Sequence, residues 1–246
     1  MPYKSQHVEF IGPPGVGKST IHQKISKQSR YYGSLPGEVC ARLLTTRKHI
    51  LLQRLMPDKA WNYIADSFLK YRVGNHFLPE FIQKHPEYVP KVIDICEEIQ
   101  YESNRVSRQC LWVASCYQIG MESRETGEVL CMHEGFLQKT VAIAWRSDRG
   151  LSLAKEYLED IPLPRAVVYL TAQPTVCLQR QEKRKRTVVA KDWAEEPLAT
   201  QNKLSNLCSN VVALLEDMEI DVIEINNDGP IKETVNKTIT DMDSTI

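Results

Sequence analysis

The chain has 246 residues, of which 42% are hydrophobic and 25% are charged, and this composition excludes a disordered or fibrous protein. Its 31 Lys and Arg residues balance its 31 Asp and Glu residues. No global charge therefore draws the chain to nucleic acid or to an anionic membrane. The length suits one α/β domain, residues 1–246, with a sizeable insertion.

The cysteines and the N-terminus predict a cytoplasmic protein with reduced thiols. The seven cysteines include no C-x-x-C pair, and most have apolar neighbours, where free thiols act as small hydrophobic groups. The first residues lack the apolar segment of a secretory signal, and no apolar run is long enough to span a bilayer. We therefore expect no membrane association, and the sequence leaves a homodimer open.

A glycine-rich motif near the N-terminus carries the strongest functional signal. Residues 12–19 match G-x-x-x-x-G-K-S, directly after the apolar run 8–11 and before a helix-like segment. Glycine lets the backbone approach a phosphate, and the N–H groups from Gly15 onward would face its oxygens. Lys18 would reach the β- and γ-phosphates of ATP, and the Ser19 hydroxyl would ligate Mg²⁺. The expected nucleotide-binding residues are Gly12, Pro13, Pro14, Gly15, Val16, Gly17, Lys18, Ser19 and Thr20.

The remaining elements alternate between long helices and short apolar strands. Further strands are expected over residues 129–132, 165–170 and 220–225, and 35–41 is a weak candidate. Helices are expected over residues 18–30, 41–55, 59–71, 76–84, 92–122, 137–145, 151–159, 175–186, 197–218 and 230–242. Strands separated by helices imply a mainly parallel sheet covered on both faces. The expected fold is a P-loop NTPase three-layer α/β/α domain, with a large helical insertion at 35–125 that would bind an acceptor.

Two other classes of P-loop protein fit poorly. A GTPase needs an N-K-x-D motif, and residues 236–239 read N-K-T-I. A motor or AAA-type ATPase should have an Asp-Glu strand end much closer to Lys18 than Glu134 is, and His133 stands at the Asp position.

The order of elements resembles the nucleoside and nucleotide kinases, thymidylate kinase most closely. The motif similarity is strong at the P-loop and moderate over residues 170–186, where V-V-Y-L precedes P-x-x-x-x-x-R-x-x-x-R. The resemblance implies that the long helix carries an arginine toward the phosphoryl acceptor, for which Arg105 is the candidate. An ion pair between Arg105 and Glu102 or Glu98 is the alternative.

The resemblance also implies an arginine-rich lid, here residues 178–193. Arg180, Arg184 and Arg186 could clamp the charge that develops on a transferring phosphoryl group. Arg180 and Arg184 are four residues apart and share one helical face. A solvated basic helix end is the alternative.

Glu134 is the candidate carboxylate beside the phosphates. It ends an apolar strand, where the ligand crevice of a parallel sheet opens. It could hold Mg²⁺ through water or accept the proton of an attacking hydroxyl. His133 stands where several such kinases have an acid, as a packed histidine or a neutral hydrogen-bonding replacement. The expected catalytic residues are thus Lys18, Glu134, Arg180 and Arg184, and the metal ligands are Ser19 and Glu134.

These features predict an ATP-dependent small-molecule kinase. It would transfer the γ-phosphoryl group to a nucleoside, a nucleotide or another small alcohol or phosphate acceptor. The rival hypothesis is an ATP-binding or ATP-hydrolysing regulatory module that acts on a protein partner. A polynucleotide-end kinase is disfavoured by the neutral net charge, although the basic run 183–186 could contact a phosphate backbone.

Overall fold

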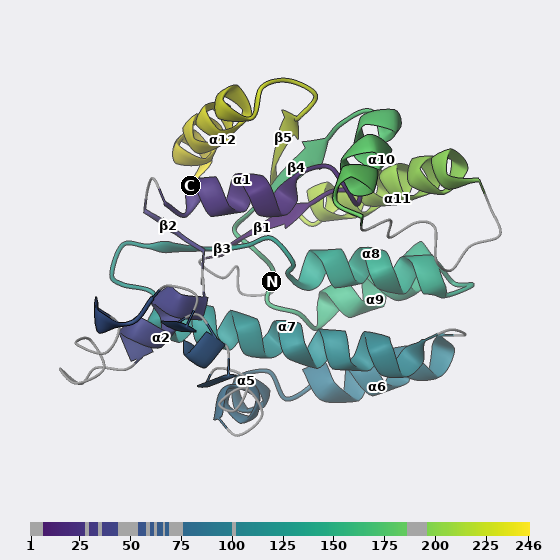
Figure 1. The fold of residues 1–246 in the computed structure, drawn as a ribbon. Coiled ribbons are helices and arrows are strands. Elements are labelled where there is room, and N and C mark those ends of the chain that lie inside the picture. Colours follow the sequence, from purple (N-terminus) through teal and green to yellow (C-terminus); the bar gives the residue numbers. More distant parts are fainter. Residues whose placement is uncertain are drawn as a thin grey trace.

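A computed structural model gives the three-dimensional structure of the chain. It describes residues 7–27, 30–33, 36–43, 54–57, 60–61, 63–65, 67–68, 76–99, 102–185 and 196–246. The described residues form a five-stranded sheet with helices on both faces (Figure 1). In this part of the chain, no helix combines the length and the apolar character needed to cross a membrane.

The sheet is parallel throughout and β1 lies at its centre. The strands are β1 (His7–Ile11), β2 (Tyr31–Tyr32), β3 (Val129–Met132), β4 (Ala166–Thr171) and β5 (Asp221–Asn226), in the order β2-β3-β1-β4-β5. The chain leaves β1 between β3 and β4, where the strand order reverses. Because ligands of open α/β sheets bind at this point, the segment after β1 is placed to form a binding site.

One face of the sheet is covered by α1 (Lys18–Ile25) and α12 (Ile231–Thr245), which lie together in Figure 1. Successive strand residues point to opposite faces, so Val8 and Phe10 both face this layer. They pack with Ile21 and Ile25 of α1 in one buried core. The apolar spacing of four residues in α1 thus fixes the helix into which the nucleotide-binding motif leads.

The other face carries a thicker helical layer. Its members are α5 (Leu78–Lys84), α6 (Tyr88–Glu98), α7 (Ser103–Ser123), α8 (Phe136–Arg146), α9 (Leu151–Glu159) and α11 (Pro197–Asp217). Ile11, Leu130 and Val167 contribute to the core on this side. The helix α10 (Pro174–Lys183) packs beside α11 and follows β4, and α2 (Pro36–Leu43) contacts α7.

The α/β class, the parallel sheet and its three layers are confirmed. The strand after the first helix is β2, whereas the weak prediction at 35–41 is wrong because α2 occupies that segment. Pro at the first position suits a helix start, and a two-residue strand gives no detectable period. The helix α1 also ends at Ile25, short of the expected residue 30.

The expected helix 92–122 is two helices. Ile99 is extended after α6, and Glu102 has a left-handed backbone with φ 58° before α7 begins. The apolar stripe continues across this break, which is why the sequence predicts one helix. Parts of the helices expected at 41–55 and 59–71 lie outside the described residues, as do lid residues 186–193 with Arg186.

Candidate functional site

The loop between β1 and α1 is held in a conformation that requires glycine. Gly15 and Gly17 have φ values of 82° and 106°, in the left-handed region. A Cβ on Gly15 would lie 2.3 Å from the carbonyl oxygen of Cys177, and one on Gly17 would lie 2.5 Å from Asn227 Nδ2. The loop is therefore wedged between α10 and the segment after β5.

The loop presents hydrogen-bond donors that the described residues do not use. The backbone N–H groups of Gly15, Gly17, Lys18 and Ser19 have no acceptor among these residues, whereas that of Val16 donates to the Pro13 carbonyl at 3.3 Å. They lie at the N-terminus of α1, where the helix dipole favours an anion. This donor set fits the phosphates of a nucleotide.

Lys18 folds back over the loop. Its Nζ donates to the carbonyl oxygens of Gly12 at 2.5 Å and Pro13 at 3.2 Å. Burial lowers the pKa of the Lys18 ammonium below its ordinary value, and the nearby Glu134 opposes that shift. Carbonyl oxygens carry only a partial negative charge. A phosphate beside Lys18 would offer its ammonium a full negative charge.

The two lid arginines lie differently. Arg184 Nη2 donates to the Thr20 hydroxyl at 3.1 Å, and Arg184 lines a cavity of about 310 Å³ over the loop. Arg180 donates instead to the carbonyl oxygens of Asn227 at 2.7 Å and Val16 at 3.4 Å. In this conformation Arg184 faces the candidate phosphate site, while Arg180 holds the loop from behind.

Three amide side chains that the sequence analysis missed also hold the loop. Gln181 and Gln201 both donate to the Pro14 carbonyl, at 3.2 and 3.1 Å, and Asn227 Nδ2 donates to the Val16 carbonyl at 2.7 Å. Pro14 fixes its own φ and has no N–H, so its carbonyl is its only backbone hydrogen-bonding group. Isolated amides in helices and loops carry no motif, and only the structure brings them together.

Glu134 joins two cavities. The P-loop cavity is the space of about 310 Å³ lined by Gly15, Lys18, Ser19, Glu134, Gln138 and Arg184, among others. The α7 cavity, of about 620 Å³, is lined by Arg105, Arg108, Trp112, His133, Glu134 and Lys139, among others. Glu134 is exposed and lines both cavities, which therefore adjoin at this residue.

One face of α7 supplies a wall of the second cavity. Arg105, Arg108, Gln109, Trp112 and Cys116 recur at three- and four-residue steps and line it together. Arg105 also pairs with Glu102 at 2.7 Å, so the alternative ion pair is present as well. The sequence gives Arg108 no expected role, because on a helical wheel it points away from the buried stripe.

His133 packs against His22 and also lines the α7 cavity. Its ring lies 4.6 Å from that of the buried His22, centroid to centroid. Burial, reinforced by His133, lowers the pKa of His22 to about 4, and burial also lowers the pKa of His133. Both imidazoles are therefore neutral near neutral pH, which agrees with either interpretation of His133, as a packed histidine or as a neutral hydrogen-bonding group.

Each cavity contains a buried polar atom without a partner in the described part of the chain. His22 shares a 2.9 Å hydrogen bond with the Cys131 carbonyl through Nε2, which must donate, so its Nδ1 is left as an acceptor. Gln138 Oε1, in the P-loop cavity, is likewise unpaired. Buried polar groups normally find partners, so both atoms fit cavities that hold polar ligands.

A buried carboxylate that the sequence analysis missed lies behind Glu134. Glu9 in β1 is fully buried and accepts the N–H groups of Phe136 at 3.0 Å and Leu137 at 2.8 Å. His7 Nε2 lies 3.1 Å away. The charge of Glu9 thus lies at the N-terminus of α8, where the helix dipole stabilises it. This contact fixes the start of α8 directly after Glu134.

No protein-family model and no curated protein matches the sequence. Among solved structures, the chain is similar to a deoxyadenosine kinase from M. mycoides with bound dCTP, at 12% identity and a TM-score of 0.49 over 97% of this chain and 99% of that chain. Such a low identity leaves the substrate to be inferred from the residues of this chain. The resemblance to thymidylate kinase stays a prediction.

Proposed function

We propose that this chain is a kinase that transfers the γ-phosphoryl group of ATP to a small anionic acceptor in the α7 cavity. The carrying observation is that Glu134 lines both this cavity and the P-loop cavity. A phosphate held by the unused N–H groups of the loop and an acceptor held by α7 would meet there. Transfer needs such a meeting of donor and acceptor.

The reaction balances with the residues at hand. An acceptor oxygen forms a bond to the γ-phosphorus, the bond to the β–γ bridging oxygen breaks, and ADP leaves with the electron pair. Lys18 and Arg184 would stabilise the charge on the transferring group. A hydroxyl acceptor would give its proton to Glu134. Mg²⁺, which Ser19 and Glu134 would hold, neutralises phosphate charge when bound.

The charges of the α7 cavity favour an anionic acceptor. Among the described residues, Arg105, Arg108 and Lys139 line it, and Glu134 supplies the one carboxylate. Neither Arg108 nor Lys139 has an ion pair with a carboxylate among the described residues, and Arg108 donates only to the Asn104 carbonyl, at 3.2 Å. Planar guanidinium groups suit phosphate recognition.

An aromatic surface narrows the acceptor further. Trp112 is 45% exposed and lines the same cavity, so its ring can stack on a planar group. The unpaired His22 Nδ1 can accept a hydrogen bond from an N–H or O–H group. A planar ring that carries a phosphate describes a nucleoside monophosphate, which we propose as the acceptor class.

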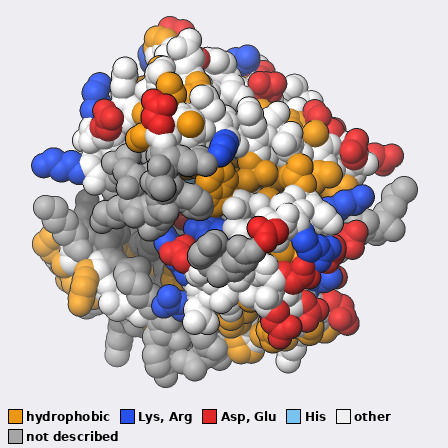
Figure 2. Space-filling model, turned by 90° about the vertical axis from the view of Figure 1, so that its right-hand side faces the viewer, with side chains coloured by type: hydrophobic (Ala, Val, Ile, Leu, Met, Phe, Trp, Pro, Cys, Tyr) orange, Lys and Arg blue, Asp and Glu red, His pale blue; other side chains and the backbone are white. Residues whose placement is uncertain are grey.

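Polynucleotide ends are a poorer fit. Figure 2 shows acidic and basic side chains intermingled over the face that it presents. A nucleic-acid strand is held by a run of cationic side chains along its phosphates. The balanced total charge adds to this argument.

The test is ADP formation by the purified chain with Mg²⁺ and ATP. Nucleosides, nucleoside monophosphates, and sugar or antibiotic alcohols are compared as acceptors. We expect nucleoside monophosphates to stimulate ADP release, and Arg184→Ala to reduce the stimulated rate by about tenfold to a hundredfold. Lys183→Ala, an exposed neighbour, is the matched control. ADP release that no acceptor changes would instead favour the rival ATP-hydrolysing module.

A further inference from the structure

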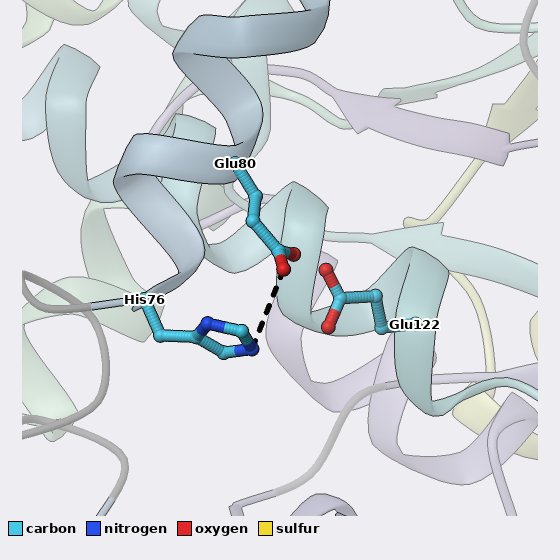
Figure 3. Close-up of side chains that lie close together, drawn as sticks. All are labelled: His76, Glu80 and Glu122. Atoms are coloured by element: carbon cyan, nitrogen blue, oxygen red, sulfur yellow. Dashed lines mark ion pairs between the residues drawn. The ribbon is translucent and has the colours of Figure 1, made fainter.

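Three side chains that could ligate a metal converge far from the candidate kinase site. His76 lies just before α5, Glu80 lies within it, and Glu122 lies near the end of α7. The ligand atoms of all three lie within 4.8 Å of one another. Figure 3 shows His76 and Glu80 reaching from one helix toward Glu122 on the other.

The two helices hold these side chains in position. His76 and Glu80 are four residues apart and so share one helical face, with Nε2 and Oε1 3.5 Å apart. The helices α5 and α7 pack against each other, and the Gln118 amide donates to Glu80 at 3.3 Å and also to Glu122. Packing thus brings two carboxylates together.

The carboxylates of Glu80 and Glu122 have few cationic partners in the part of the molecule that the structure describes. Three other acids of this side of the described chain have arginine partners, in the pairs Glu98–Arg149, Glu102–Arg146 and Glu128–Arg42. Among the described residues, neither Glu80 nor Glu122 has an ion pair with a lysine or arginine, and only His76 pairs with Glu80. Two carboxylates that face each other repel when both are charged, and a cation bound between them would remove this repulsion.

We infer that His76, Glu80 and Glu122 form a site for a divalent transition-metal ion that ties α5 to α7. One imidazole and two carboxylates suit Zn²⁺ or a neighbouring first-row metal better than Mg²⁺, which prefers oxygen ligands and water. Ligand bonds to Zn²⁺ are about 2.0–2.2 Å long, so ligand atoms are at most about 4.4 Å apart. Separations of up to 4.8 Å would therefore have to shorten when the ion binds, and the exposed Glu122 side chain has room to move.

This metal site is separate from the proposed kinase chemistry. Glu122 lies 17 residues beyond Arg105 on α7, which is about 25 Å along the helix. The ion would hold α5 against α7 and stabilise the folded chain, because it binds only where the two helices meet. Its presence can therefore be tested without nucleotide or acceptor.

The test is Zn²⁺ titration of the full chain by calorimetry, after chelator treatment and with excess Mg²⁺ present to fill sites for hard cations. We expect the wild-type chain to bind one equivalent of Zn²⁺, with an affinity that His76→Ala and Glu122→Gln each reduce by at least about tenfold. Loss of a group that only supports a metal ligand already costs about tenfold, so loss of a ligand should cost at least as much. Glu97→Gln, an exposed acid on α6, is the matched control and should bind as the wild type does.

Thermal unfolding supplies a second readout. Zn²⁺ should raise the melting temperature of the wild-type chain and of Glu97→Gln, but not that of Glu122→Gln. Because Glu122 is exposed, this variant should fold even if His76→Ala does not. Equal Zn²⁺ affinity and stoichiometry in the wild type and in Glu122→Gln would overturn the inference.

Discussion

The two cavities that meet at Glu134 are built in different ways. The P-loop cavity is made largely of backbone, with unused N–H groups and carbonyls held by Gln181, Gln201 and Asn227. The α7 cavity is made of side chains from one helix face and from the end of β3. Backbone geometry restricts which residues fit and so leaves a motif, whereas a side-chain surface leaves none. The type of reaction can thus be recognised from the sequence more easily than the substrate.

The largest effect should come from the P-loop side. Lys18→Ala removes the cation that would stabilise the transferring phosphoryl group, and we expect phosphotransfer to fall by about a thousandfold. The measurement is the initial rate of ADP formation at saturating acceptor. Lys24→Ala, an exposed change on the same helix, should keep the wild-type rate. A wild-type rate in Lys18→Ala would show that the loop is not the phosphoryl-donor site, and the two cavities would then not have the separate roles proposed for them.

A pH effect should come from the histidine behind the α7 cavity. His22 has a pKa of about 4 in the folded chain against an ordinary value of 6.5, because burial disfavours its charged form. As the pH falls from about 6.5 to about 4, the unfolded chain gains a proton that the folded chain does not. The free energy of unfolding is therefore highest above about pH 6.5, and it decreases by up to about 3 kcal/mol as the pH falls to about 4.

The measurement of this pH effect is the free energy of unfolding in urea from about pH 4 to about pH 8. His22→Gln keeps a donor for the Cys131 carbonyl and cannot titrate in this window, so its pH dependence should be flatter by the same amount. Parallel curves for the two proteins would show that His22 is not buried in its neutral form.

A smaller effect should follow a change at the junction of the cavities. Glu9→Gln replaces a charged acceptor of two backbone N–H groups by a neutral amide of the same shape. We expect a loss of about 2 kcal/mol in the free energy of unfolding, since hydrogen bonds to charged groups contribute about 1.5–3 kcal/mol. Chemical denaturation measures it. Glu224→Gln, an exposed change in β5, should be nearly neutral, and equal stability of both variants would contradict the role given to Glu9.

The smallest effect should lie on the α7 side. Arg108→Ala removes one of the three cations that line the α7 cavity among the described residues. We expect the KM for a nucleoside monophosphate to rise about tenfold while the KM for ATP stays unchanged. Steady-state kinetics with each substrate varied separately measures both constants. Arg165→Ala, which lies outside both cavities, is the control. A rise in the KM for ATP instead would place Arg108 on the nucleotide side and erase the distinction between the cavities.

The parts of the fold that the sequence predicts are those with a strong local signal. The P-loop, the strands near 129–132 and 165–170, and the helix 151–159 stand within a residue or two of their expected bounds. The strand β2 could not be predicted because two residues show no periodicity. The break at Glu102 was hidden because the apolar stripe runs through it.

The parts of the site that the sequence does not predict depend on contacts between distant residues. Glu9 accepts N–H groups from residues 127 and 128 positions away, so only its charge within an apolar strand hints at a role. Arg108 could have been found by testing each face of α7 for a second spacing pattern. Two parts of the site have simpler origins. The place of Glu134 beside both cavities follows from the strand order, and the loop N–H donors follow from the motif.

The central claim is that a phosphoryl group passes from the P-loop cavity to an anionic acceptor across Glu134. The most direct measurement is the fate of radiolabelled γ-phosphate when the chain is incubated with Mg²⁺, ATP and a nucleoside monophosphate. We expect the label on the nucleoside diphosphate, at a rate that Glu134→Gln reduces by about a hundredfold because the amide is a weaker ligand for Mg²⁺. Label that appears only as inorganic phosphate, at a rate independent of the acceptor, would contradict the account.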